Sequence, residues 1–135
     1  MNLIMQIILL VWFFGCIVSY KTKKKTLVDG VGIKSAEFFM LCLYSAGIVT
    51  YYVIYDIGRW ILLGVLVSWF VVQFFCHWCF TIFGASEKKL EGYNKCFRNS
   101  VRIIPASETR LIPDLYHIVL HMIILTNIVL IIIFL

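Results

Sequence analysis

A short polar stripe opens the last apolar segment of the chain. Asp114, His117 and His121 lie three and four residues apart, and at about 100° per residue a helix places them on one face. Two imidazoles at i and i+4 can reach one metal ion, and a carboxylate one turn earlier can be a third ligand or orient the first imidazole. The stripe therefore predicts a group of catalytic or metal-binding residues formed by His117, His121 and Asp114.

A second polar group interrupts the third apolar segment. It is the run Cys76-His77-Trp78-Cys79, with Gln73 one turn earlier. At about 1.5 Å per residue, His77 and His121 lie at a similar depth from the same membrane boundary. His77 is therefore a predicted fourth metal ligand, and His77 and Cys76 are predicted cofactor-binding residues. Glu37, at the start of the second apolar segment, is expected on the same side.

Four interpretations of the histidines remain open. They are a structural network of interhelical hydrogen bonds, a divalent metal site, a metal-free site for proton transfer, and a haem bound by His77 with His117 or His121. Haem ranks below a divalent metal because the order Cys-His-Trp-Cys is not the covalent haem motif. A redox dithiol ranks below simple packing of Cys76 and Cys79 between helices, because the chain lacks a second Cys-x-x-Cys.

The elements that carry these residues are apolar and nearly free of charge. Of the 135 residues, 62% are hydrophobic and only 14% are charged, which is too little polar sequence to coat a water-soluble domain. A membrane-crossing helix needs about 20 apolar residues. The sequence therefore predicts an all-α fold, one polytopic membrane domain over residues 1–135. Its four-helix bundle would have spans at about 1–20, 36–56, 59–84 and 112–135.

The positive charges orient this bundle. All Lys and Arg residues except Arg59 fall in the segments 21–37 and 87–110. Basic loops stay on the cytoplasmic side, so both loops are predicted to be cytoplasmic and both termini non-cytoplasmic. The net charge of +5 does not indicate nucleic acid, because basic loops beside membrane spans normally contact anionic lipid headgroups.

The second basic loop has a helical apolar pattern. Its apolar residues recur at spacings of three and four and are Leu90, Tyr93, Phe97, Val101 and Ile104. This pattern predicts an amphipathic helix over about 87–104, lying in the cytoplasmic membrane interface. Lys34, Arg98 and Arg102 are predicted to hold a lipid headgroup. Within the bundle, Gln6 and Asn127 lie at comparable depth and are expected to bond to each other.

Two functions fit these features. The first is an enzyme or cofactor-binding protein that acts on a lipid or other amphiphile at the cytoplasmic membrane face, with its His, Asp and Cys residues binding a metal or exchanging protons. The second is a non-enzymatic accessory subunit whose polar stripe docks on a larger membrane protein. The expected partners are membrane lipids, and either further copies of the chain or that larger protein.

Overall fold

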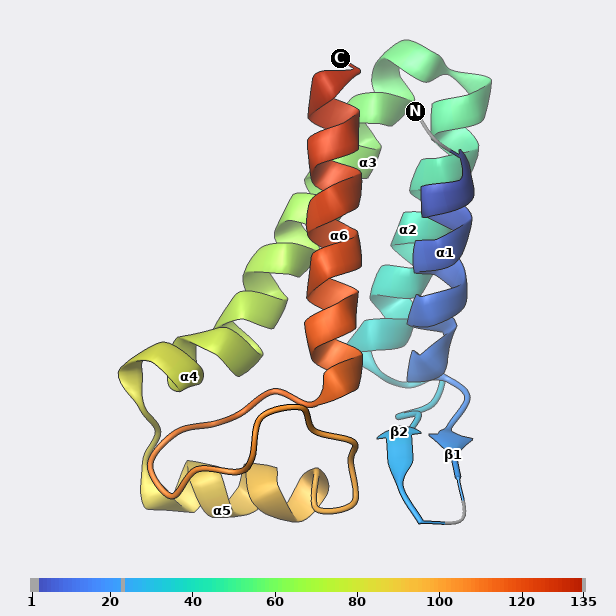
Figure 1. Ribbon diagram of the computed structural model, residues 1–135. Coiled ribbons are helices and arrows are strands. Elements are labelled where there is room, and N and C mark those ends of the chain that lie inside the picture. Colours follow the sequence, from blue (N-terminus) through green and yellow to red (C-terminus); the bar gives the residue numbers. More distant parts are fainter. Residues whose placement is uncertain (1–2, 23, 135) are drawn as a thin grey trace.

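A bundle of helices forms the body of the molecule in the computed structural model, which describes residues 3–22 and 24–134 (Figure 1). Its four helices are α1 (Leu3–Phe13), α2 (Ala36–Val53), α3 (Tyr55–Gln73) and α6 (Leu115–Ile133). A wide π-helical turn, Phe74–Trp78, joins α3 to α4 (Cys79–Phe83). Both ends of the chain lie at one end of the bundle, and the basic loops lie at the other, which we call the basic end.

Three of these helices are long and apolar enough to cross a membrane, as expected for a multi-pass membrane protein. They are Ala36–Val53, Tyr55–Phe83 and Leu115–Ile133. The apolar segment Leu3–Cys16 is shorter, so the predicted first span, 1–20, was too long. Its last turn is a 3₁₀ helix, after which the Cys16 carbonyl accepts hydrogen bonds from the N–H groups of Val31 and Gly32 at 2.8 and 3.2 Å. These contacts from a distant segment end the helix.

A polar network fastens α1, α2 and α6 together inside the apolar core. Gln6 donates to Asn127 Oδ1 at 2.7 Å, and the Tyr44 hydroxyl donates to Gln6 Oε1 at 2.5 Å. Asn127 also donates to the Ile123 carbonyl of its own helix. The predicted bond between Gln6 and Asn127 is therefore confirmed, and Tyr44 is a third member that sequence reasoning did not include.

The turn between α2 and α3 is tighter than expected. The chain reverses at Ile54, so α2 ends at Val53 rather than at residue 56, and α3 begins at Tyr55 rather than at residue 59. Gly58 lies so close to the backbone of Tyr51 that a Cβ atom would overlap it. A glycine at this position allows the two helices to approach each other closely.

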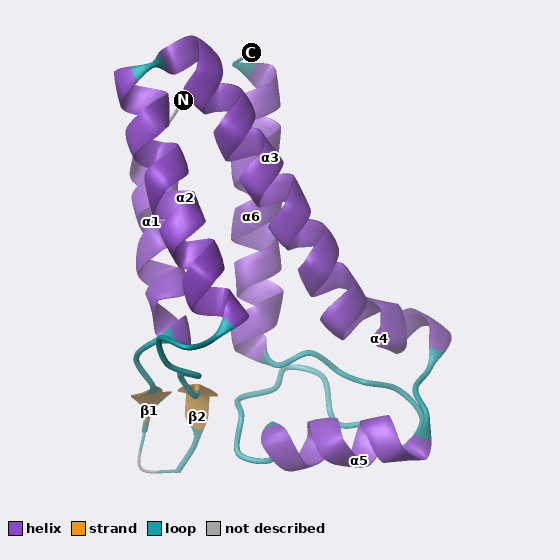
Figure 2. Cartoon of the chain, turned by 180° about the vertical axis from the view of Figure 1, so that it is seen from behind, coloured by secondary structure: helices purple, strands orange, loops and turns teal. Residues whose placement is uncertain are grey.

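The two basic loops meet at the basic end. A short hairpin of β1 (Tyr20–Lys21) and β2 (Thr26–Val28) lies beside the second loop (Figure 2). Thr26 donates to the carbonyl of Asn99, and Val101 donates to the carbonyl of Thr26, at 2.9 and 3.0 Å. The fold is thus mostly rather than entirely helical, because backbone pairing within the first basic loop forms two short strands that no local pattern predicted. The second loop pairs with β2 at Thr26.

This pairing also shortens the amphipathic helix. The helix α5 (Glu87–Cys96) lies across the basic end, and it ends well before the predicted residue 104. Beyond it, Arg102 folds back and donates to Asn94 Oδ1 at 3.2 and 3.3 Å and to the Phe97 carbonyl at 3.4 Å. After α5 the chain turns at residues 97–99, and Ser100 and Val101 then pair with Thr26 of β2.

Candidate functional site

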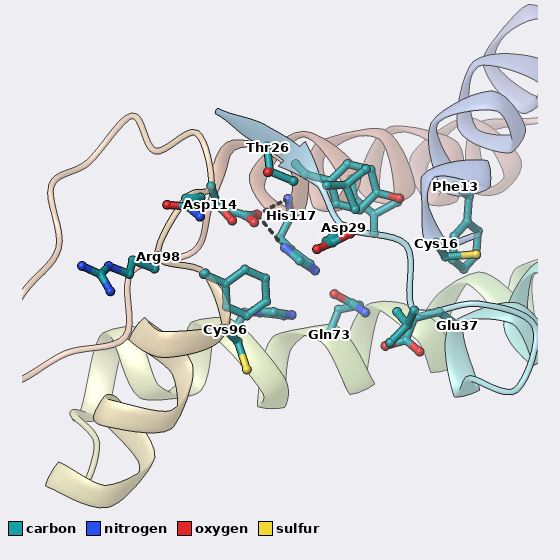
Figure 3. A pocket seen from close by; sticks show the side chains of 18 of the residues that line it. Phe13, Cys16, Thr26, Asp29, Glu37, Gln73, Cys96, Arg98, Asp114 and His117 are labelled. Carbon is teal, nitrogen blue, oxygen red and sulfur yellow. Dashed lines mark hydrogen bonds and ion pairs between the residues drawn. The ribbon is translucent and has the colours of Figure 1, made fainter. Parts of the chain in front are cut away.

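A cavity of about 450 Å³ lies at the basic end, where α3, α6, the hairpin and the end of α5 converge. Its polar lining includes five of the residues singled out above. They are Glu37, Gln73, His77, Asp114 and His117. Figure 3 shows the His117 ring directed into this cavity, between Asp114 and Gln73.

Asp114 and His117 form the most tightly bonded pair of this site. Asp114 is the N-cap of α6, and its Oδ1 accepts the backbone N–H of His117 at 3.0 Å. The same oxygen lies 2.6 Å from His117 Nδ1. The Asp114 side chain is 2% exposed and that of His117 is 15% exposed. A carboxylate bonded to Nδ1 holds the proton there and leaves Nε2 as an acceptor, which is the form of a general base.

His77 packs directly against this pair. The ring centroids of His77 and His117 are 4.0 Å apart, with the rings tilted by 32°. His77 Nδ1 lies 3.0 Å from the hydroxyl of Tyr93, a residue of α5. Burial raises the pKa of the Tyr93 phenol, and the nearby charge of Asp114 acts in the same direction. Tyr93 therefore stays neutral, and its hydroxyl is available to donate to His77.

His77 is the residue of the Cys-His-Trp-Cys run that faces the cavity. The buried positions of α3 recur at spacings of three and four, and they are Gly58, Leu62, Leu66, Trp69 and Gln73. His77 follows four residues after Gln73, within the wide turn in which Cys79 N–H bonds to the Phe74 carbonyl. His77 is buried and Cys76 is exposed. Cys76 is not among the residues that line the cavity, and its role beside a cofactor stays a prediction.

His121 also lies outside the cavity. Its Nδ1 bonds to the backbone carbonyl of His117 at 2.9 Å, and its ring meets the edges of Phe70 and Trp78. His117 and His121 therefore face different surroundings, although they share a helical face in a simple wheel. His121 borders a separate, smaller groove that is otherwise lined by apolar side chains.

The predicted metal set is not assembled. Within residues 3–22 and 24–134, no group of three or more His, Cys, Asp or Glu side chains is placed to hold one metal ion. Asp114, His117 and His77 meet, but through a hydrogen bond and a ring contact, while His121 turns away. The close contact between the rings of His77 and His117 likewise leaves no room for a haem iron between them.

The three predicted headgroup-binding residues have different positions. Arg98 lines the cavity. Arg102 holds the end of α5 through Asn94, and Lys34 is an exposed residue before α2. Lys95 joins Arg98 in the cavity lining, and the opposite charges of Asp29 and Glu37 are also there.

Trp69 lines the cavity one turn before Gln73, as its unusual place in an apolar segment suggested. Sequence reasoning missed the contact of Tyr93 with His77. No spacing indicated it, because the position of Tyr93 depends on how α5 folds back across the basic end.

No protein-family model, no curated protein and no solved structure matches this chain. The function therefore has to be argued from the chemistry of the site itself.

Proposed function

We propose that this chain is a small integral membrane enzyme that admits the polar part of a lipid or other amphiphile into the cavity at its basic end. There His117, oriented by Asp114, accepts a proton from the substrate. The observation that carries the proposal is the 2.6 Å contact of a buried carboxylate with an imidazole that faces a cavity of about 450 Å³.

His77 supplies a hydrogen-bond donor in this proposal. When the neutral Tyr93 hydroxyl donates to Nδ1 of His77, the proton of that ring resides on Nε2. His117 carries the opposite arrangement, with its proton on Nδ1 toward Asp114. The adjacent rings thus present one acceptor, which takes a proton from the substrate, and one N–H donor, which stabilises the negative charge that the proton transfer leaves on the substrate.

The position of the site supports an amphiphilic substrate. Three of the described helices are long and apolar enough to cross a membrane. We propose that they do so, and that a membrane lipid presents its head to the cavity while its chains stay in hydrocarbon. Lys95 and Arg98 are positioned to contact an anionic group of that head. We further propose that the basic end is cytoplasmic, because both Lys- and Arg-rich loops lie there.

A matched pair of variants tests this function. His117→Leu and His121→Leu place the same substitution on α6 one turn apart, inside and outside the cavity. Each protein is reconstituted into nanodiscs made from the polar lipids of the expression host, and the lipids are followed over time by mass spectrometry. We expect the wild type to convert a lipid species, His117→Leu to lose about 100-fold or more in rate, and His121→Leu to remain within about twofold.

Two outcomes would contradict the proposal. One is a lipid composition that the wild type leaves unchanged, and the other is equal conversion by the wild type and His117→Leu. An accessory subunit would give the first outcome together with co-purification of a larger membrane protein. The structure favours the enzyme, because the polar stripe expected to dock on a partner is covered by the chain itself: Asp114 is 1% and His121 5% exposed.

A further inference from the structure

Two residues of α3 that line the cavity each carry a buried polar atom without a hydrogen-bond partner in the described part of the chain. The atoms are Nε1 of Trp69, a donor, and Oε1 of Gln73, an acceptor. Both residues are 4% exposed. Leaving a buried polar group unsatisfied costs about 1–3 kcal/mol, so such groups call for a partner supplied by something the cavity takes in.

The two atoms are held in place beside each other. Residues at i and i+4 lie on one helical face, with Cβ atoms about 5–6 Å apart. The Trp69 indole is stacked on Phe13 with ring centroids 5.5 Å apart, so it cannot turn to seek another acceptor without losing this contact. Gln73 faces His117 across the cavity (Figure 3).

We propose that Trp69 and Gln73 bind an uncharged hydroxyl group of the substrate. This inference rests on the proposed function and names the substrate class: a hydroxylated amphiphile. A hydroxyl oxygen can accept from the Trp69 N–H while its proton is donated to Gln73 Oε1. A carboxylate or ionised phosphate oxygen can only accept and leaves Oε1 of Gln73 unsatisfied. An ammonium group can only donate and leaves Trp69 unsatisfied.

The charged residues that line the cavity are consistent with a preference for an uncharged hydroxyl group over an anion or a cation. Lys95, Arg98, Asp29 and Glu37 line it together, so cations and anions oppose each other and no single sign dominates. The uncharged pair of Trp69 and Gln73 therefore selects for a hydroxyl close to His117, whatever charge the rest of the head carries.

The probe for this inference is monooleoylglycerol, which is amphiphilic and uncharged and bears free hydroxyl groups. Its dimethyl ether keeps the chain and the oxygen atoms but has no donor. Wild-type protein is placed in phosphatidylcholine nanodiscs containing one or the other, and the bound fraction is measured by native mass spectrometry. We expect monooleoylglycerol to bind at least 10-fold more tightly than its ether.

Three variants test whether Trp69 and Gln73 cause the preference for monooleoylglycerol over its ether. Gln73→Leu removes the acceptor, Trp69→Phe removes the donor but keeps a ring against Phe13, and the exposed neighbour Ser68→Ala is the control. We expect the first two to weaken monooleoylglycerol binding about 10-fold and to erase its advantage over the ether. Ser68→Ala should behave as the wild type. In the absence of ligand, Gln73→Leu should melt no lower than the wild type, because it removes an unsatisfied buried atom.

Equal binding of monooleoylglycerol and its ether would overturn the inference and indicate that water fills the space between Trp69 and Gln73. A lower melting temperature of ligand-free Gln73→Leu would also overturn it, because Gln73 would then have a partner within the protein. Neither result affects the comparison of His117→Leu with His121→Leu, so the failure of this inference is distinguishable from the failure of the proposed function.

Discussion

One carboxylate oxygen of Asp114 has two roles in this protein. Asp114 Oδ1 accepts the backbone N–H of His117, in the first turn of α6, and also bonds to the side chain of His117. The residue that starts the helix is therefore also the one that sets the proton position of the imidazole. A buried carboxylate oxygen without hydrogen bonds would destabilise the fold, and the two hydrogen bonds to Oδ1 offset that cost in free energy.

Substitutions of Asp114 should separate these two tasks. Asparagine caps a helix about as well as aspartate, whereas alanine does not. We expect Asp114→Ala to lower the free energy of unfolding by about 2 kcal/mol, and Asp114→Asn by about 1 kcal/mol or less. Denaturation in detergent micelles, followed by circular dichroism, measures both. Equal losses in the two variants would show that capping by Asp114 contributes nothing.

At the level of elements, α3, α6, the hairpin and the end of α5 shape the cavity. His77 lies in the π-helical turn after α3, and α5 places Tyr93 beside it. The sequence predicted the existence of these helices from their apolar patterns. It did not predict the wide turn, because an extra residue in a helical turn leaves no mark in the spacing of apolar residues.

Glycine substitutions test the packing of α2 on α3. A Cβ at Gly58 overlaps the backbone of Tyr51, whereas a Cβ at Gly64 meets no described atom within 4 Å. We expect Gly58→Ala to lower the free energy of unfolding by about 3 kcal/mol or more. Gly64→Ala, in the middle of the same helix, should raise it by about 0.5–1 kcal/mol. A neutral Gly58→Ala variant would mean that the two helices are not in this close contact.

On the scale of the whole molecule, the two basic loops together cover the basic end of the bundle. Backbone hydrogen bonds link Thr26 to the segment around Asn99 and Val101, so loops separated by two helices share one end of the bundle. The termini lie at the opposite end. This arrangement agrees with the charge pattern, which requires the two loops to be on the same side of the membrane.

Cysteine labelling tests which side of the membrane the basic end faces. One protein keeps Cys96 as its only cysteine, and a second has Phe134→Cys as its only cysteine. Both positions are exposed, at the basic end and at the opposite end respectively. With a membrane-impermeant maleimide, we expect intact cells to label only residue 134 and inverted vesicles to label only Cys96. Labelling of Cys96 from outside would reverse the proposed orientation.

The sequence by itself determined the order of the apolar helices, the common side of the two basic loops, and the bond of Gln6 with Asn127. These features follow from the composition and charge of each segment, and from the number of residues between a side chain and the end of its apolar segment. The sequence predicted four membrane spans, whereas three of the described helices are long and apolar enough to cross a membrane. The sequence also singled out His77, Asp114 and His117, because ionisable residues are rare in apolar segments.

Only the tertiary structure decided which of these residues meet. The rings of His77 and His117 meet between two helices, and His121 turns to its own backbone and to Phe70. The helix predicted over 87–104 ends early, and the first apolar helix ends at Cys16. At both places, backbone N–H and C=O groups form hydrogen bonds with distant segments instead of continuing the helix. Such bonds form between residues far apart in the chain, and no spacing within a segment encodes them.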